Sequence, residues 1–247
     1  MTPTREDYTT VIREILRPYL SSPQDAWKGI YEALLWFEHD VPHIIDANYL
    51  KQGAWRVRAE RVQQELADQL NCSVVDLPLR VDKLLRSALF PEPTQRQNPL
   101  GIGFVTALFQ ILERFSSPRY VFRPEEDIGT TVFPGIFEAP RSRPDVVVVS
   151  DSKEVAVISA KWSLRHDRLK DLSDECDYFK RLRPSLRFYA VTNEFNPARL
   201  RKVLQSYCID ALFHVCPRLL FVAVDDDKHS GLLKVKDLTD LIAHFSS

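Results

Sequence analysis

A lysine at the end of an apolar run is the first residue here whose type and spacing suggest chemistry. Lys161 follows the run "EVAVISA", and Asp145 precedes the run "VVVV" sixteen residues earlier. If the two runs are antiparallel strands joined at "SDSK", the carboxylate and the amine lie at the same end of a hairpin. Such a pair can share a divalent ion and a phosphate, because Mg²⁺ binds one or two carboxylates, waters and substrate phosphates. The lysine can orient an attacking water or neutralise charge developing on phosphorus.

Two arginines and an aspartate follow the lysine closely: Arg165, Asp167 and Arg168. On a helix, Arg165, Arg168 and Glu175 share one face, because they are spaced by three and seven residues. An arginine can form two hydrogen bonds to O6 and N7 of guanine, and an aspartate can accept one from cytosine N4. We interpret this run as a reader of adjacent G and C bases. The alternative is a solvated helix face, with the arginines paired to Asp171 or Asp174.

The elements that must position these residues change type near residue 95. Before it, apolar residues repeat at intervals of three and four, which predicts helices over 4–20, 22–40, 54–70 and 77–89. The segment 90–99, "FPEPTQRQNP", contains three prolines and no apolar core, and is typical of a connector.

After the connector, helices and strands alternate. A strongly apolar helix is predicted over 101–115, followed by β-branched and aromatic runs that favour strands. Asn196 and Pro197 are typical of the cap and first residue of a helix. This order predicts an α/β domain with a mixed sheet flanked by helices, preceded by an all-α region. The strands are expected at 119–127, 143–151, 154–162, 186–193 and 218–226, and the other helices at 164–182 and 196–207.

Composition sets further limits. The chain has 247 residues, of which 45% are hydrophobic and 11% aromatic, so it should fold around a buried core. Its net charge of −1 predicts that any DNA contact comes from a local patch. No apolar stretch is long enough to span a membrane, and no signal segment is evident. Four cysteines without CxxC spacing are typical of reduced thiols, so we expect a cytoplasmic protein.

The sequence contains Pro144-Asp145 and, fourteen residues after the aspartate, Ser159-Ala160-Lys161. This arrangement resembles the motif of the PD-(D/E)XK nuclease family, in which a Pro-Asp pair precedes an acidic residue, any residue and a lysine. The position of the family's second acid holds Ser159 instead. In the restriction endonucleases that cut CCGG-type sites (the NgoMIV-like group), Ser-x-Lys is normal and a glutamate on the following helix supplies the carboxylate. Glu175, separated from Lys161 by thirteen residues, stands in that place.

The same group carries Lys-Trp-(Ser/Thr)-x-Arg-x-Asp-Arg, and residues 161–168, "KWSLRHDR", match it at every defined position. The resemblance covers residues 145–175 closely and 100–225 in element order, and says little about residues 1–95. It implies a further acidic residue on a helix before Asp145. Glu113 is the expected residue, with Glu125 and Glu126 as alternatives.

The resemblance implies a restriction-endonuclease-like fold and a type II restriction endonuclease of a restriction-modification system. Such an enzyme would use Mg²⁺, bound by Asp145 and Glu175, to cut double-stranded DNA as a homodimer. The expected palindrome has a CCGG core, or CC and GG split by one base pair, and cleavage leaves 5′ overhangs. The alternative is a repair or transposition nuclease of the same fold, or a non-catalytic DNA-binding member. The implied catalytic residues are Asp145, Ser159, Lys161, Glu175 and Glu113.

These expectations divide the chain into a helical N-terminal region, 1–95, and a nuclease domain, 96–247. Residues 65–87 weakly resemble a helix-turn-helix, with Ala67 inside and Arg80 at the start of a second helix. The N-terminal region is therefore expected either to contact DNA or to act as a helical cap that supports dimer contacts.

Overall fold

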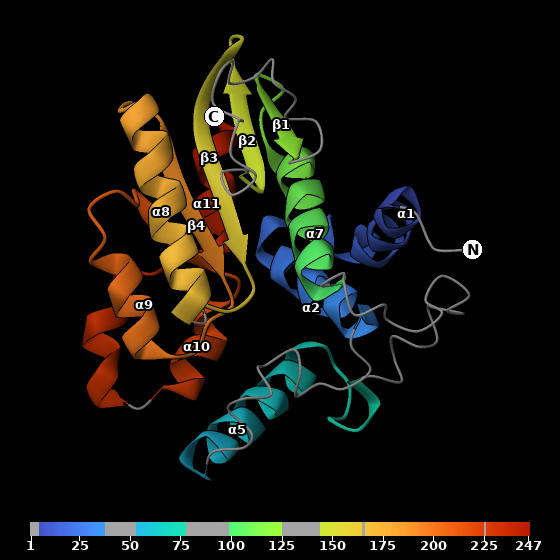
Figure 1. Cartoon of the computed structure of the whole chain (residues 1–247). Coiled ribbons are helices and arrows are strands. Elements are labelled where there is room, and N and C mark those ends of the chain that lie inside the picture. The colour runs from blue at the N-terminus through green and yellow to red at the C-terminus, as the bar shows by residue number, and fades with distance from the viewer. Residues whose placement is uncertain (1–4, 38–52, 78–98, 125–143, 165, 225) are drawn as a thin grey trace. The chain divides into compact units, whose positions relative to one another are not determined.

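The computed structural model describes residues 5–37, 53–77, 99–124, 144–164, 166–224 and 226–247 (Figure 1). The chain divides into two compact units. One comprises residues 1–111 and 216–226, and the other comprises 112–215 and 227–247. The predicted boundary at residue 95 lies outside the described residues.

The first unit is helical where it is described. Helix α1 packs on α2, and α5 packs on α10. These helices confirm the predictions for 4–20, 22–40 and 54–70 over their described residues, whereas the helix predicted at 77–89 lies almost entirely outside them. The elements are α1 (Arg5–Leu16), the 3-10 turns η1 (Arg17–Tyr19) and η2 (Pro23–Asp25), α2 (Ala26–Phe37), α5 (Gly53–Gln69), α10 (Pro217–Ala223) and most of α7 (Pro99–Phe115).

The second unit contains a six-stranded sheet in the order β1-β2-β3-β4-β5-β6. Strands β1 to β3 are antiparallel, and β3 to β6 are parallel, so the sheet is mixed as predicted. The strands are β1 (Tyr120–Pro124), β2 (Val146–Ser150), β3 (Lys153–Lys161), β4 (Arg187–Thr192), β5 (Ala211–His214) and β6 (Lys236–Asp237).

Helices flank both faces of this sheet (Figure 1). Helix α8 (His166–Leu182) lies on the face that carries Ser159, and α11 (Leu238–Ser246) lies on the face of Tyr189. The valines of β2 are almost completely buried, which explains their continuous apolar run. Helix α9 (Pro197–Leu204) begins after Asn196, whose side chain accepts from two backbone N–H groups, as predicted. The predicted fold class is confirmed.

The hairpin predicted between Asp145 and Lys161 is present. Strands β2 and β3 pair antiparallel, with Val146 opposite Ile158 and an irregularity between Val148 and Val149. The turn uses Asp151 and Ser152, which adopt positive φ values of 50° and 61°. Short polar side chains tolerate this left-handed region better than bulky ones, which explains the turn sequence.

The strand predicted at 218–226 is wrong: residues Pro217–Ala223 form helix α10. Pro217 suits the first turn of a helix, and the buried residues Leu219, Leu220 and Ala223 follow helical spacing. The apolar run is continuous, so it carries no period that separates strand from helix. The strands in this part of the chain are β5 and β6, which are too short to give a strong pattern.

Candidate active site

The β2–β3 hairpin brings the predicted aspartate and lysine into contact. Continuing the strand register by one residue places Asp145 opposite Ser159 at the end of the hairpin. The Lys161 ammonium donates to Asp145 Oδ2 at 2.7 Å, and both side chains are largely buried, with 19% and 16% exposed. A partly buried ion pair with this geometry holds both groups in place.

Asp145 is fixed by the backbone as well as by the lysine. The N–H of Ala160 donates to the same oxygen, Oδ2, at 2.7 Å. Among the described residues, no hydrogen bond is made to the other oxygen, Oδ1. Asp145 is therefore oriented through one of its two carboxylate oxygens.

Helix α8 brings a second carboxylate to this place. Its apolar residues Leu172, Cys176 and Phe179 are buried, and Glu175 lies on the same buried face. The Ser159 hydroxyl lies 3.0 Å from Glu175 Oε2 and 3.4 Å from Asp145 Oδ2. Its single proton therefore bonds mainly to Glu175, and the serine stands between the two carboxylates.

Asp145, Ser159, Lys161 and Glu175 are called the carboxylate–lysine cluster below. Burial raises the pKa of Glu175. The positive charge of Lys161 opposes this effect and the negative charge of Asp145 adds to it, so the pKa reaches about 7. Burial lowers the pKa of Lys161, but Asp145 and Glu175 outweigh it, so this pKa lies above its ordinary value. The cluster therefore holds a firmly charged lysine beside a carboxyl group that titrates near neutrality.

One polar atom of the cluster is left unsatisfied. Glu175 Oε1 is buried and has no hydrogen-bond partner among the described residues. A buried acceptor without a partner costs free energy, and a bound cation would remove that cost. Within the described residues, no group of three or more His, Cys, Asp or Glu side chains forms a metal cage. Two carboxylates with open oxygens fit an ion that completes its shell with water and substrate oxygens.

Among the residues predicted to read bases, only Arg168 has a side chain that the structure describes. Its side chain is half-buried, and its charge lowers the pKa of Lys161, which places it within electrostatic reach of the cluster. In the part of the chain that the structure describes, no ion pair joins Arg168 to Asp171 or Asp174. Arg165 and the side chain of Asp167 lie outside the described residues, and their reading role stays a prediction.

Glu113, the expected additional acid, lies in the last turn of α7 with an exposed side chain, and its part in the site stays a prediction. The alternatives Glu125 and Glu126 lie outside the described residues. A third carboxylate in the site stays a prediction.

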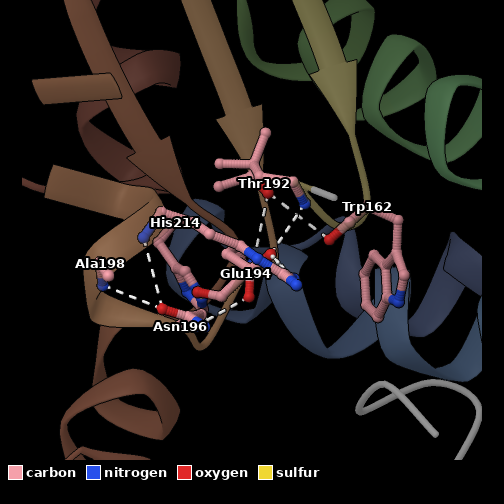
Figure 2. A network of polar contacts seen from close by, with 8 residues as sticks. Trp162, Thr192, Glu194, Asn196, Ala198 and His214 are labelled. Atoms are coloured by element: carbon pink, nitrogen blue, oxygen red, sulfur yellow. Dashed lines mark hydrogen bonds and ion pairs between the residues drawn. The ribbon is translucent and has the colours of Figure 1, made fainter. Parts of the chain in front are cut away.

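A network that sequence reasoning missed adjoins the cluster (Figure 2). It links Trp162, directly after Lys161, to the loop that follows β4 and to His214 at the end of β5. The sequence feature that could have indicated this network is Glu194, an acidic residue that lies between an apolar strand and a helix cap in "VTNEFNP". Its side chain is completely buried and bonds to Leu164, Asn196 and Arg199.

Comparisons with known proteins include a restriction endonuclease. No protein-family model matches the chain, and no curated protein sequence matches it. Among solved structures, the chain is similar to a complex of the restriction endonuclease PspGI with its substrate DNA. The TM-score is 0.43 at 12% sequence identity, and the likeness covers 74% of this chain and 71% of that one. In the part of the chain that the structure describes, no helix has the length and apolar character of a membrane span.

Proposed function

We propose that this protein is a metal-dependent deoxyribonuclease of the type II restriction class. The observation that supports this most is the carboxylate–lysine cluster. Residues separated by up to thirty positions in the sequence meet there with hydrogen bonds of 2.7–3.0 Å, and a serine joins the two carboxylates. The sequence resemblance assigns the same four residues to catalysis.

Each residue of the cluster has a defined part in the proposed reaction. Asp145 Oδ1 and Glu175 Oε1, the two open oxygens, would hold Mg²⁺. The bound ion would supply a Lewis acid beside the scissile phosphate. Lys161, held by Asp145, would orient the attacking water and balance the negative charge that develops on the phosphate oxygens. Ser159 would keep the two carboxylates at a fixed separation.

The specificity is proposed from the residues at the start of α8. Arg165 and Arg168 would each read a guanine, and Asp167 would accept from cytosine, which predicts a CCGG or CC-N-GG core. A palindrome of this kind suits a homodimer, because each chain carries one active centre and one half-site reader. Cleavage beside the core would leave 5′ overhangs.

The test is digestion of a plasmid of known sequence with Mg²⁺, followed by mapping of the ends. We expect discrete fragments whose ends coincide with C/G-rich palindromes, and no cleavage in EDTA. The Asp145→Ala protein, prepared in the same way, controls for contaminating nucleases. Fragments with ends at unrelated sequences would favour a structure-specific nuclease, and equal cleavage by the Asp145→Ala protein would disprove the assignment of the site.

A further inference from the structure

Residues 162–164, which follow Lys161 and lead toward α8, connect the two parts of the proposed site. Lys161 ends β3, and α8 begins at His166 with the residues proposed to read bases. Strands β3 and β4 pair in parallel as far as Lys161 and Thr192. Beyond this pair the ladder stops, so the path of residues 162–164 depends on other contacts.

Those contacts come from the residues at the end of β4 and in the loop after it (Figure 2). The carbonyl oxygen of Trp162 accepts from the N–H of Asn193 at 3.1 Å and from the hydroxyl of Thr192 at 3.5 Å. The N–H of Leu164 donates to Glu194 Oε2 at 2.9 Å. The segment is therefore held at both ends, and at its α8 end the acceptor is the carboxylate of Glu194.

Glu194 is itself held on every side. Its Oε2 also accepts from Arg199 Nη1 at 3.1 Å, and its Oε1 accepts from the N–H of Asn196 at 2.8 Å. Its backbone N–H donates to the Thr192 hydroxyl, and its carbonyl oxygen lies 3.2 Å from His214 Nε2. Both carboxylate oxygens are engaged and the side chain is 0% exposed, so this group braces the chain rather than binding a ligand.

We propose that Glu194 is a positioning residue that couples base reading to cleavage. By holding Leu164, its carboxylate sets the first turn of α8 relative to Lys161. This inference rests on the proposed function, because Glu194 can couple base reading to cleavage only if α8 reads DNA and the carboxylate–lysine cluster cuts it.

The physical reason is the division of the site between two elements. Lys161 lies on β3, whereas Arg168 and Glu175 lie on α8. If α8 begins at a slightly different place, these two residues move relative to Lys161. A misplacement of about 1 Å can slow a reaction by roughly 100-fold. The loss of cleavage rate should be greatest on the cognate site, because there the base contacts and the metal site must form at the same time.

The direct test is the Glu194→Gln variant. Glutamine keeps the shape but loses the negative charge, and its one carbonyl oxygen faces three donors, from Leu164, Asn196 and Arg199. The bond that holds Leu164 is therefore weakened or lost. We expect single-turnover cleavage of the cognate site to slow at least about tenfold, and cleavage of a site with one changed base pair to slow less than about twofold. The ratio of the two rates does not depend on the fraction of folded enzyme.

The matched control is Asn196→Ala. This change removes the acceptor for the first N–H groups of α9, from Ala198 and Arg199, without touching residues 162–164. We expect a lower Tm and an unchanged ratio of cognate to changed-site cleavage. If both variants lower the ratio equally, or if Glu194→Gln leaves it unchanged, the coupling role is disproved.

Hydrogen exchange separates this inference from the proposed function. In DNA-free protein, Glu194→Gln should accelerate exchange of the Leu164 amide and of the first turn of α8, and leave the β3–β4 ladder as in the wild type. Unchanged exchange at 162–168 would overturn the positioning role, whether or not the protein cuts DNA. If the wild type cuts no DNA with Mg²⁺, the proposed function fails, while faster local exchange would still support Glu194 as the group that holds α8.

Discussion

Two buried glutamates near the end of β3 have opposite surroundings. Glu175, on α8, has one carboxylate oxygen with no partner among the described residues, and burial raises its pKa to about 7. Glu194, after β4, has both oxygens bonded to backbone N–H groups and one also to an arginine. The two carboxylates are similarly buried, so burial alone does not distinguish a residue that binds a ligand from one that holds the backbone in place.

The difference lies in which bonds are made inside the protein. A fully bonded buried carboxylate stabilises the arrangement of its donors. A buried carboxylate with an unmade bond destabilises the protein until a ligand completes it. This difference supports the proposals that Glu175 binds a ligand and that Glu194 holds the backbone in place. Substitutions at the two positions should differ in kind, which the predictions below test.

The largest effect is expected at the carboxylate–lysine cluster. Alanine in place of Asp145 or Glu175 removes half of the proposed metal ligands, so cleavage should fall by at least about a thousandfold. Binding of cognate DNA with Ca²⁺ should persist in the Lys161→Ala protein, which keeps both carboxylates. Gel-shift and cleavage assays on one oligonucleotide measure both. Near-normal cleavage by Glu175→Ala would show that Glu175 is not a metal ligand and so does not differ from Glu194 in function. Asp174 or Glu154 would then be the next candidates for the second carboxylate.

A smaller effect is expected for Arg168→Ala. If this arginine reads a guanine, its loss should weaken cognate binding by about 1–3 kcal/mol, or roughly five- to 150-fold. Binding to random DNA should weaken much less, because base contacts are made only at the cognate site. Titrations of both DNAs at one salt concentration give the two values. Equal losses would show that Arg168 contacts the phosphate backbone and reads no base.

The sequence predicts the cluster well because strand alternation and the hairpin register decide it. Asp145 and Lys161 stand at the ends of adjacent strands, and the polar turn at 151–152 leaves little choice of pairing. The family resemblance implies Glu175, and the structure places it on the buried face of α8 with Leu172 and Phe179. Local patterns therefore suffice wherever neighbouring elements in the sequence are also neighbours in the sheet.

Local patterns fail where partners are distant or where the apolar run has no period. The bond from Leu164 to Glu194 spans thirty residues, and nothing near either residue specifies it. The run "RLLFVAV" has the composition of a strand, but Pro217 starts a helix and helical burial decides the outcome. Strands β5 and β6 are short and gain their place from pairing in the sheet rather than from propensity.

The raised pKa of Glu175 predicts a pH-dependent stability in metal-free protein. Between its ordinary pKa of 4.5 and about 7, the folded state keeps a proton that the unfolded state releases. The free energy of unfolding should therefore decrease as pH rises through this range, by up to ~1.4 kcal/mol per pH unit. Chemical denaturation of wild type and Glu175→Gln at several pH values isolates this contribution. A pH slope that does not change with the substitution would contradict the raised pKa.

The smallest effect is expected for Ser159→Ala. This substitution tests whether the serine holds the Glu175 carboxylate in the position proposed for metal binding. The Ser159 hydroxyl donates to Glu175 Oε2 at 3.0 Å, so its loss removes one hydrogen bond but neither proposed metal ligand. Cleavage should slow only a few-fold, with a higher Mg²⁺ requirement, because Glu175 is held less firmly and its charged form is less favoured. A Mg²⁺ titration of the cleavage rate measures both effects. Ser159→Glu in a Glu175→Ala background should restore part of the activity, because it returns a carboxylate to the same place from β3 instead of α8. A loss with Ser159→Ala as large as that with Glu175→Ala would mean that the hydroxyl itself takes part in the reaction.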